Sequence, residues 1–123
     1  MSVTPYLNFP DAIKAIAYYV EAMGAALQFR LPGQDPKTTM HAVLEVPGGQ
    51  IFLSDMGPVE KPAAVSINLG LENAKAVNEL AARLKEHGAT INHGPEDAFW
   101  GDRFAEITDP FGHHWILTAP KDS

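Results

Sequence analysis

The sequence predicts an α+β fold made of two βαβββ units that follow one another in the chain. Three observations predict it: an amphipathic helical pattern occurs twice, strand-like alternation surrounds each helix, and the two halves match in one register. In that register Gly24-Ala25 corresponds to Gly88-Ala89, and residues 51–54 correspond to residues 115–118. Such self-similarity indicates a duplicated unit. We expect a single domain, residues 1–123, with repeats at about residues 1–57 and 64–123.

One helix is expected in each half. The first begins at Pro10-Asp11 and ends at Gly24, and the second begins near Asn73 and ends at Gly88, with basic side chains in its last turn that suit the helix dipole. Apolar residues at the i, i+3, i+4, i+7 spacing define a buried stripe on each helix. The stripes are Ile13, Ile16, Ala17 and Val20 in the first helix, and Val77, Leu80, Ala81 and Leu84 in the second.

Alternation assigns two faces to each sheet, since successive residues of a strand point to opposite sides. One face should pack beneath the helix, and it includes Val65, Ile67 and Leu69 before the second helix and Trp115 in the last strand. The opposite face mixes polar and aromatic side chains, which is more typical of a cavity wall than of a second core. The irregular stretches 32–37 and 94–101 are expected at the rim of that cavity, and residues 57–64 should link the halves.

Composition excludes several classes of function. The chain has 123 residues, 46% of them hydrophobic, a formal charge of −6 and no cysteine. It has no basic stripe for nucleic acid or an anionic membrane, and no thiolate nucleophile or cysteine-based metal site. The motifs of nucleotide-binding loops, zincins and serine hydrolases are absent from the sequence. We expect a cytoplasmic protein whose ligand is neutral or cationic.

Several motifs resemble those of the vicinal oxygen chelate superfamily, the glyoxalase, bleomycin-resistance and dioxygenase group, and especially its PhnB-like or glyoxalase-like branch. They are Pro5-Tyr6-Leu7, the run Phe-Trp-Gly-Asp-Arg-Phe at 99–104, and the run Asp-Pro-Phe-Gly-His-His-Trp at 109–115. The resemblance covers nearly the whole chain. It implies that each unit forms a curved mixed sheet and that two units, from one chain or from two chains, enclose a cleft. We expect a homodimer, because family clefts are commonly built with dimer contacts and four-stranded sheets leave open edges.

The resemblance also locates the four positions at which metal-dependent members bind a divalent ion. Carried over, they fall on Thr4, Phe52, Ser66 and Ile116. Phenyl and alkyl side chains donate nothing to a metal, and a register shift of one or two residues recovers no His/Glu set. The expectation is therefore a member without the family's metal site and without a cofactor.

The mixed faces supply the candidate ligand-binding residues. The aromatic pair in the 94–101 stretch could form the lid or wall of an apolar pocket, or could anchor the loop to the sheet edge. Polar side chains of the first and fifth strands could orient a ligand or face water. The candidate set is Tyr6, Asn8, His41, Phe52, Ser66, Asn68, Phe99, Trp100, His114 and Ile116.

The histidines allow alternative roles. His114 could hydrogen-bond a ligand, act as a general base, or bond a carbonyl of a neighbouring strand, and the same choice between a functional and a structural histidine applies to His41. A metal held by His41 and His114 from opposite sheets is a further alternative. His87 is expected at a helix end and His93 in a loop, neither with a functional role.

The acidic residues are expected to be structural. Asp102 and Arg103 invite a salt bridge, and residues 109–112 form a tight turn in which Asp109 bonds the backbone. Glu45 and Glu106 could meet as a carboxylate pair, but we favour two exposed strand residues because close acids need a raised pKa to coexist.

The repeat register also keeps these two glutamates from being equivalent. It sets Glu45 against Asp109 and Glu106 against Ala42.

Two classes of function follow. The first is a metal-free protein that sequesters a small amphipathic or cationic molecule, with aromatic rings for contact area and Asn, Ser and Tyr for orientation. The second is a lyase, isomerase or dioxygenase-like enzyme of the same superfamily, with a non-standard metal site or with His114 as its base. A pure interaction protein gains support only if the protein's own side chains fill the cleft.

Overall fold

The computed structural model describes residues 3–57, which form one compact unit, and residues 65–122, which form a second. The elements of the first unit are β1 (Tyr6–Asn8), α1 (Ala12–Met23), β2 (Ala26–Pro32), β3 (Thr39–Val46) and β4 (Gly49–Ser54). Those of the second are β5 (Ser66–Gly70), α2 (Ala74–Glu86), β6 (Thr90–Asp97), β7 (Asp102–Thr108) and β8 (His114–Pro120). The predicted α+β fold of two βαβββ units is confirmed. Apart from Gly57, the predicted linker lies outside the described residues.

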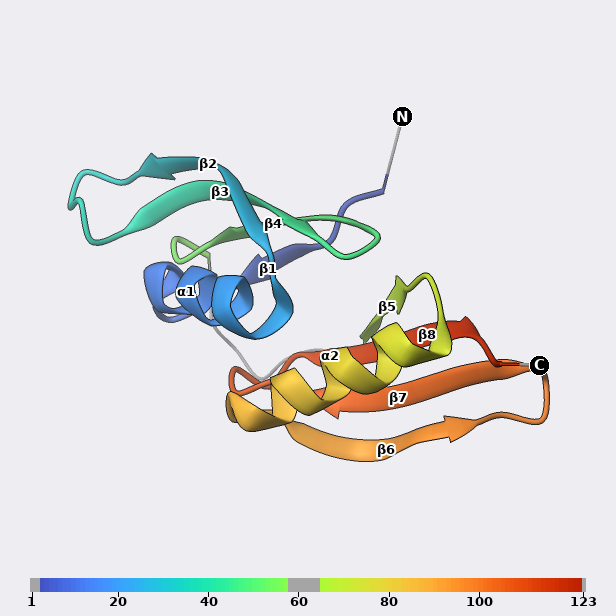
Figure 1. The fold of residues 1–123 in the computed structure, drawn as a ribbon. Coiled ribbons are helices and arrows are strands. Elements are labelled where there is room, and N and C mark those ends of the chain that lie inside the picture. The colour runs from blue at the N-terminus through green and yellow to red at the C-terminus, as the bar shows by residue number, and fades with distance from the viewer. Residues whose placement is uncertain (1–2, 58–64, 123) are drawn as a thin grey trace. The chain divides into compact units, whose positions relative to one another are not determined.

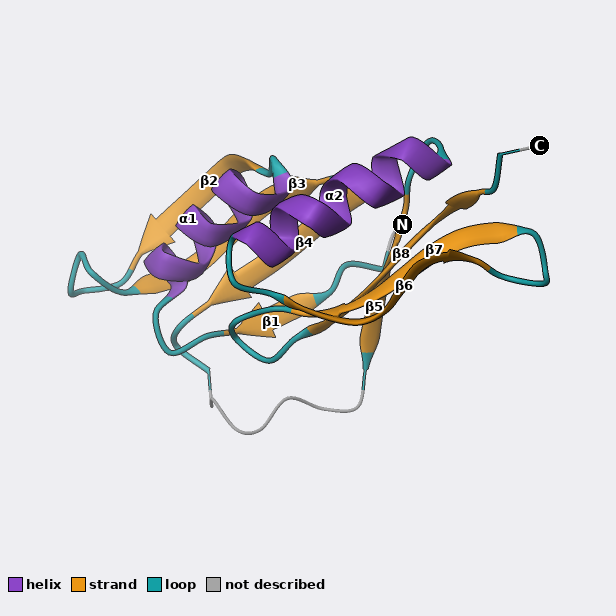
Figure 2. Ribbon diagram, turned by 60° about the horizontal axis from the view of Figure 1, so that its bottom comes forward, coloured by secondary structure: helices purple, strands orange, loops and turns teal. Residues whose placement is uncertain are grey.

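Each unit contains one four-stranded mixed sheet, and the two sheets have the same topology. The strand order is β1-β4-β3-β2 in the first and β5-β8-β7-β6 in the second. The first strand of each unit pairs in parallel with the last, and the other neighbours are antiparallel. In each unit the helix lies along one side of its own sheet, as can be followed for α1 and α2 in Figures 1 and 2. We call the opposite side of each sheet its distal face.

Both helices are capped as the sequence predicts. The Asp11 side chain accepts a hydrogen bond from the first turn of α1, and Gly24 ends that helix in the left-handed conformation, with φ of 72°. The Asn73 side chain caps α2 in the same way, and Arg83 and Lys85 lie in its last turn, where cations offset the helix dipole. Within the described residues no helix is long and apolar enough to cross a membrane.

The buried stripe predicted for α2 is confirmed, whereas the one predicted for α1 is wrong. Ile13 and Val20 keep 42% and 40% of their surface exposed, Ala17 is also exposed, and of the predicted stripe only Ile16 is buried. The buried residues of α1 are Ala12, Ala15, Ile16, Tyr19, Ala22 and Met23. A helix this apolar satisfies the i, i+3, i+4, i+7 spacing in more than one register, so the spacing alone does not select a face.

The core of the second unit lies where alternation predicts. Trp115 is 1% exposed, and Leu69, Ile107 and Leu117 are buried with it. Val65 differs from the prediction, because it precedes β5 and is 63% exposed. A residue just outside a strand has no neighbouring strand to fix which way it points.

Half of the stretch 94–101 is strand, contrary to the prediction of an irregular segment. β6 continues to Asp97, so His93 is a strand residue and only residues 98–101 form the turn. The pairing with β7 shifts register on both sides of His93, which lets Gly94 and Pro95 lie within an edge strand. The stretch 32–37 is irregular as predicted, apart from Pro32, the last residue of β2.

Strand pairing corrects how the two repeats correspond. Phe52 pairs with Val43 in the first unit, and its counterpart Ile116 pairs with Glu106 in the second. Glu106 therefore corresponds to Val43 and not to Ala42.

The cause is the turn before the last strand. Nine positions separate Val43 from Phe52 but ten separate Glu106 from Ile116, so the second turn has one extra residue. By the same count Glu45 corresponds to Thr108 rather than Asp109. A one-residue difference inside a turn leaves no trace in the helix and strand periodicities, which is why the sequence register missed it.

Candidate ligand-binding site

The distal face of the second unit carries polar side chains from neighbouring strands. Thr108 on β7 and His114 on β8 are directly paired, as are Glu106 and Ile116. Ser66 on β5 pairs in turn with His114. This strand register brings three of the predicted residues, Ser66, His114 and Ile116, to one place on the sheet.

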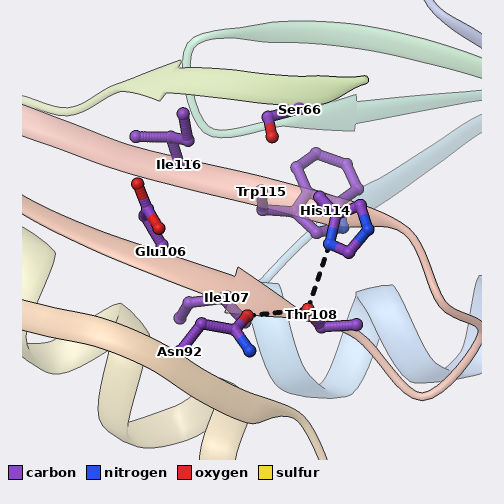
Figure 3. A pocket seen from close by; sticks show the side chains of 8 residues that line it. All are labelled: Ser66, Asn92, Glu106, Ile107, Thr108, His114, Trp115 and Ile116. Carbon is purple, nitrogen blue, oxygen red and sulfur yellow. Dashed lines mark hydrogen bonds between the residues drawn. The ribbon is translucent and has the colours of Figure 1, made fainter. Parts of the chain in front are cut away.

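A chain of hydrogen bonds crosses this face (Figure 3). The Thr108 hydroxyl donates to Oδ1 of Asn92 on β6 at 2.7 Å, and the same Thr108 oxygen lies 3.1 Å from Nδ1 of His114. One alternative from the sequence was a hydrogen bond from His114 to a carbonyl of a neighbouring strand. In the structure its partner is instead the hydroxyl of Thr108. The three residues come from three adjacent strands, so the sheet itself sets their spacing.

A pocket of about 200 Å³ lies beside this chain. Figure 3 shows its lining: Ser66, Asn92, Glu106, Ile107, Thr108, His114, Trp115 and Ile116. Glu106 is the only carboxylate among these residues, and none of them is a lysine or arginine. Among the described residues the Glu106 side chain makes no hydrogen bond or ion pair, so its acceptor oxygens are available.

Aromatic rings continue the distal face from this pocket towards the β6–β7 turn. Phe104 stacks on His93, with ring centroids 5.7 Å apart and planes 20° from parallel. Phe104 also contacts Trp100, whose ring centroid is 5.7 Å away. Phe99 packs edge-on against Trp100 at the tip, where the two side chains are 95% and 61% exposed. The predicted aromatic pair is thus joined to rings of the sheet, and Oε1 of Glu96 lies 2.7 Å from Nε2 of His93.

The distal face of the first unit carries a second aromatic cluster. The hydroxyl of Tyr6 lies 3.1 Å from Nδ1 of His41, and the His41 ring packs edge-on against Phe52 at 5.0 Å. Phe29 adjoins His41 at 6.2 Å. Asn8 lies apart from these rings, where its amide oxygen accepts a bond of 3.4 Å from Ser54.

The predicted set thus divides between the two units. Tyr6, His41 and Phe52 cluster in the first, and Ser66, His114 and Ile116 line the pocket in the second. Asn68, also in the second unit, accepts a hydrogen bond of 3.1 Å from Thr118 on the same distal face.

Sequence reasoning missed four residues of the second unit's distal face: Asn92, His93, Phe104 and Thr108. Alternation from Glu106 would have placed Phe104 and Thr108 on this face, because all three lie two residues apart on one strand. No sequence signal places Asn92 and His93, since the register shift in β6 breaks the alternation.

Two of the four positions that the resemblance implies for a metal carry side chains that cannot bind one, Phe52 and Ile116. Tyr6 and Asn68, not Thr4 and Ser66, are the first-strand residues that pair with Phe52 and Ile116. With either assignment the last-strand positions carry a phenyl and an alkyl side chain, which donate nothing. Within residues 3–57 and 65–122, no group of three or more His, Asp or Glu side chains is placed to hold an ion.

The charged residues near the turns are structural. Asp109 is buried and accepts hydrogen bonds from the backbone of its own turn, as predicted. The predicted ion pair of Arg103 with Asp102 is wrong: Arg103 contacts Asp97 at 3.4 Å and Asn78 on α2 at 3.0 Å. Adjacent strand residues point to opposite faces, which separates the side chains of Asp102 and Arg103.

Comparison with known proteins gives consistent matches. The family model described as the Glyoxalase/Bleomycin resistance protein/Dioxygenase superfamily matches residues 3–117. The uncharacterized protein Mb0911c of Mycobacterium bovis is similar to this chain, with 35% identity covering 97% of this chain and 83% of its own length. Protein YjdN of Escherichia coli is 27% identical, covering 98% and 97%. The crystal structure of PA1353 from Pseudomonas aeruginosa has a similar fold, with a TM-score of 0.83, 26% identity and 99% of both chains covered.

Proposed function

The chain belongs to the Glyoxalase/Bleomycin resistance protein/Dioxygenase superfamily, and we propose that it is a small-molecule-binding member that works without the family's metal site. The ligand is amphipathic or cationic. The observation that carries this proposal is the polar pocket on the distal face of the second unit, together with the aromatic row that includes Phe104 on the same strand, β7.

Charge supports a neutral or cationic ligand. The pocket holds the carboxylate of Glu106 and no lysine or arginine, and the whole chain carries a formal charge of −6. An anion would meet Glu106 without a compensating cation, whereas a cation would gain a charge-assisted hydrogen bond.

The exposed rings support an apolar portion in the ligand. Phe99 and Trp100 are too exposed to stabilise the fold by burial, yet Trp100 is held against Phe104 at the edge of the sheet. Aromatic side chains placed in this way provide large contact area at low entropic cost and attract cations over their faces.

A ligand screen by thermal or chemical unfolding tests the proposal. A ligand present at about 100 times its dissociation constant should add about 2.7 kcal/mol to the free energy of unfolding. Trp100→Ala should weaken any ligand so found, while Ile13→Ala, on the exposed side of α1, serves as the matched control and should not. The proposal fails if a broad screen of amines, neutral aromatics and acids gives no stabilisation beyond error.

An enzyme that uses His114 as a general base is the second candidate function. The Thr108 contact favours it, because a hydrogen bond at Nδ1 orients the imidazole and leaves Nε2 able to accept a proton. For any compound found to be turned over, His114→Ala should abolish turnover. Unchanged turnover in that variant would remove this candidate.

The homodimer and the cytoplasmic location stay predictions. Sedimentation at micromolar concentration should give the mass of two chains, and a monomer would contradict the first. The single-domain organisation also remains a proposal, and a single unfolding transition reported alike by tryptophan fluorescence and by circular dichroism would support it.

A further inference from the structure

We propose that Asn92 and Thr108 hold His114 in the tautomer that leaves Nε2 as a hydrogen-bond acceptor, so that the pocket selects an organic ammonium group. The tautomer follows from the contacts alone. The choice of ligand group rests on the function proposed above.

Counting protons along the hydrogen-bond chain fixes the tautomer. The Asn92 Oδ1 atom can only accept, so the single hydroxyl proton of Thr108 is used in the 2.7 Å bond to it. The 3.1 Å contact between Thr108 and His114 Nδ1 then needs its proton from the imidazole. A neutral imidazole has one N–H, which leaves the lone pair on Nε2.

Glu106 adds a second acceptor beside the first. It precedes Thr108 by two residues on β7, and Thr108 pairs with His114, so Glu106 and His114 are diagonal neighbours on one face. Diagonal neighbours in an antiparallel pair lie about 7–8 Å apart, so the two side chains are separate acceptors on one face of the sheet. The pocket thus presents an uncharged nitrogen acceptor and a carboxylate.

An organic ammonium matches these two acceptors. It brings several N–H donors and a positive charge, whereas a carboxylate or phosphate would meet two acceptors and no cationic side chain among the lining residues. The apolar part of the same ligand can pack against two side chains. Ile116 is paired with Glu106, and Phe104 lies two residues before Glu106 on β7. The inferred class is an amine carrying an aromatic or aliphatic group.

Imidazole nitrogen NMR tests the tautomer without any ligand. In the ¹⁵N-labelled protein at alkaline pH, His114 should show a protonated Nδ1 and an unprotonated Nε2. Thr108→Val removes the acceptor for Nδ1–H and should shift the population towards Nε2–H. Thr118→Val is the matched control, since its hydroxyl bonds Asn68 on the same face, and it should leave the His114 signals unchanged. A wild-type His114 protonated at Nε2 would overturn the inference.

A pair of probes that differ in the charged group tests the ligand class. Phenethylamine should shift the His114 Nε2 signal, and phenylacetate should not. Glu106→Gln should weaken phenethylamine binding about tenfold or more, the loss expected for a charge-assisted hydrogen bond. Equal binding of the two probes would overturn the ammonium assignment. If the wider screen finds ligands but no amine among them, the ammonium assignment fails while the proposed function stands. If nothing binds at all, the proposed function fails, and the NMR result still decides the tautomer of His114.

Discussion

Asp109→Asn should destabilise the second unit through one specific contact. Asp109 is 4% exposed and uses its two oxygens differently: Oδ1 accepts from the backbone N–H groups of Phe111 and His113, and Oδ2 accepts from Nε1 of Trp115 at 2.8 Å. Asparagine retains the first oxygen but places an amide NH₂ against the indole N–H. Because Trp115 is 1% exposed, its indole N–H cannot donate to water instead.

The expected cost is that of an unsatisfied buried donor, about 1–3 kcal/mol in the free energy of unfolding. Asp109→Ala also deprives the two backbone N–H groups of their acceptor, and at about 1 kcal/mol for each it should cost roughly 3–5 kcal/mol. Asp102→Asn is the matched control, since its carboxylate makes no comparable contact within the described residues, and it should change stability by less than about 0.5 kcal/mol.

Urea unfolding followed by far-UV circular dichroism measures these differences at constant m-value. A double-mutant cycle with Trp115→Phe isolates the contact, because phenylalanine has no N–H to leave unpaired. The coupling energy should be about 1–2 kcal/mol. If Asp109→Asn is neutral, or the coupling is zero, the indole–carboxylate bond does not stabilise the turn and the reasoning is refuted.

Four further substitutions test the fold. Gly94→Ala should destabilise by more than about 1 kcal/mol in the same urea assay, because Gly94 has φ of +75° and an added Cβ would collide with the Phe104 carbonyl oxygen; a neutral result would contradict this backbone geometry. Asn73→Ala should cost about 1 kcal/mol by removing the N-cap of α2, and helicity should fall with it. On α1, Ile16→Ala should cost about 2–5 kcal/mol and Ile13→Ala less than about 1 kcal/mol; the reverse order would restore the stripe predicted from sequence.

Much of the fold could be predicted because its signals are local. The caps of both helices depend on residues within one turn, and the buried face of α2 depends on a spacing that only one side of that helix satisfies. The face of α1 was not predictable in this way, since apolar residues occupy most of its surface. There the sheet beneath the helix decides which residues are buried.

The candidate site was predicted only in part, because its geometry depends on strand pairing. Alternation correctly placed His114 and Ile116 on one face, and the buried Trp115 on the other. It gave no reason to join His114 to Asn92, which lies on an edge strand two strands away and next to a shift in register.

The sequence by itself determined the βαβββ repeat, the two helix caps, the buried face of α2 and the burial of Trp115. Each follows from periodicities and turn residues that act over a few positions along the chain. Only the tertiary structure decided the buried face of α1, the one-residue offset between the repeats, and the hydrogen bonds that join Asn92, Thr108 and His114. These depend on which residues lie opposite one another across a sheet, and pairing over long range is set by the packing of the whole unit.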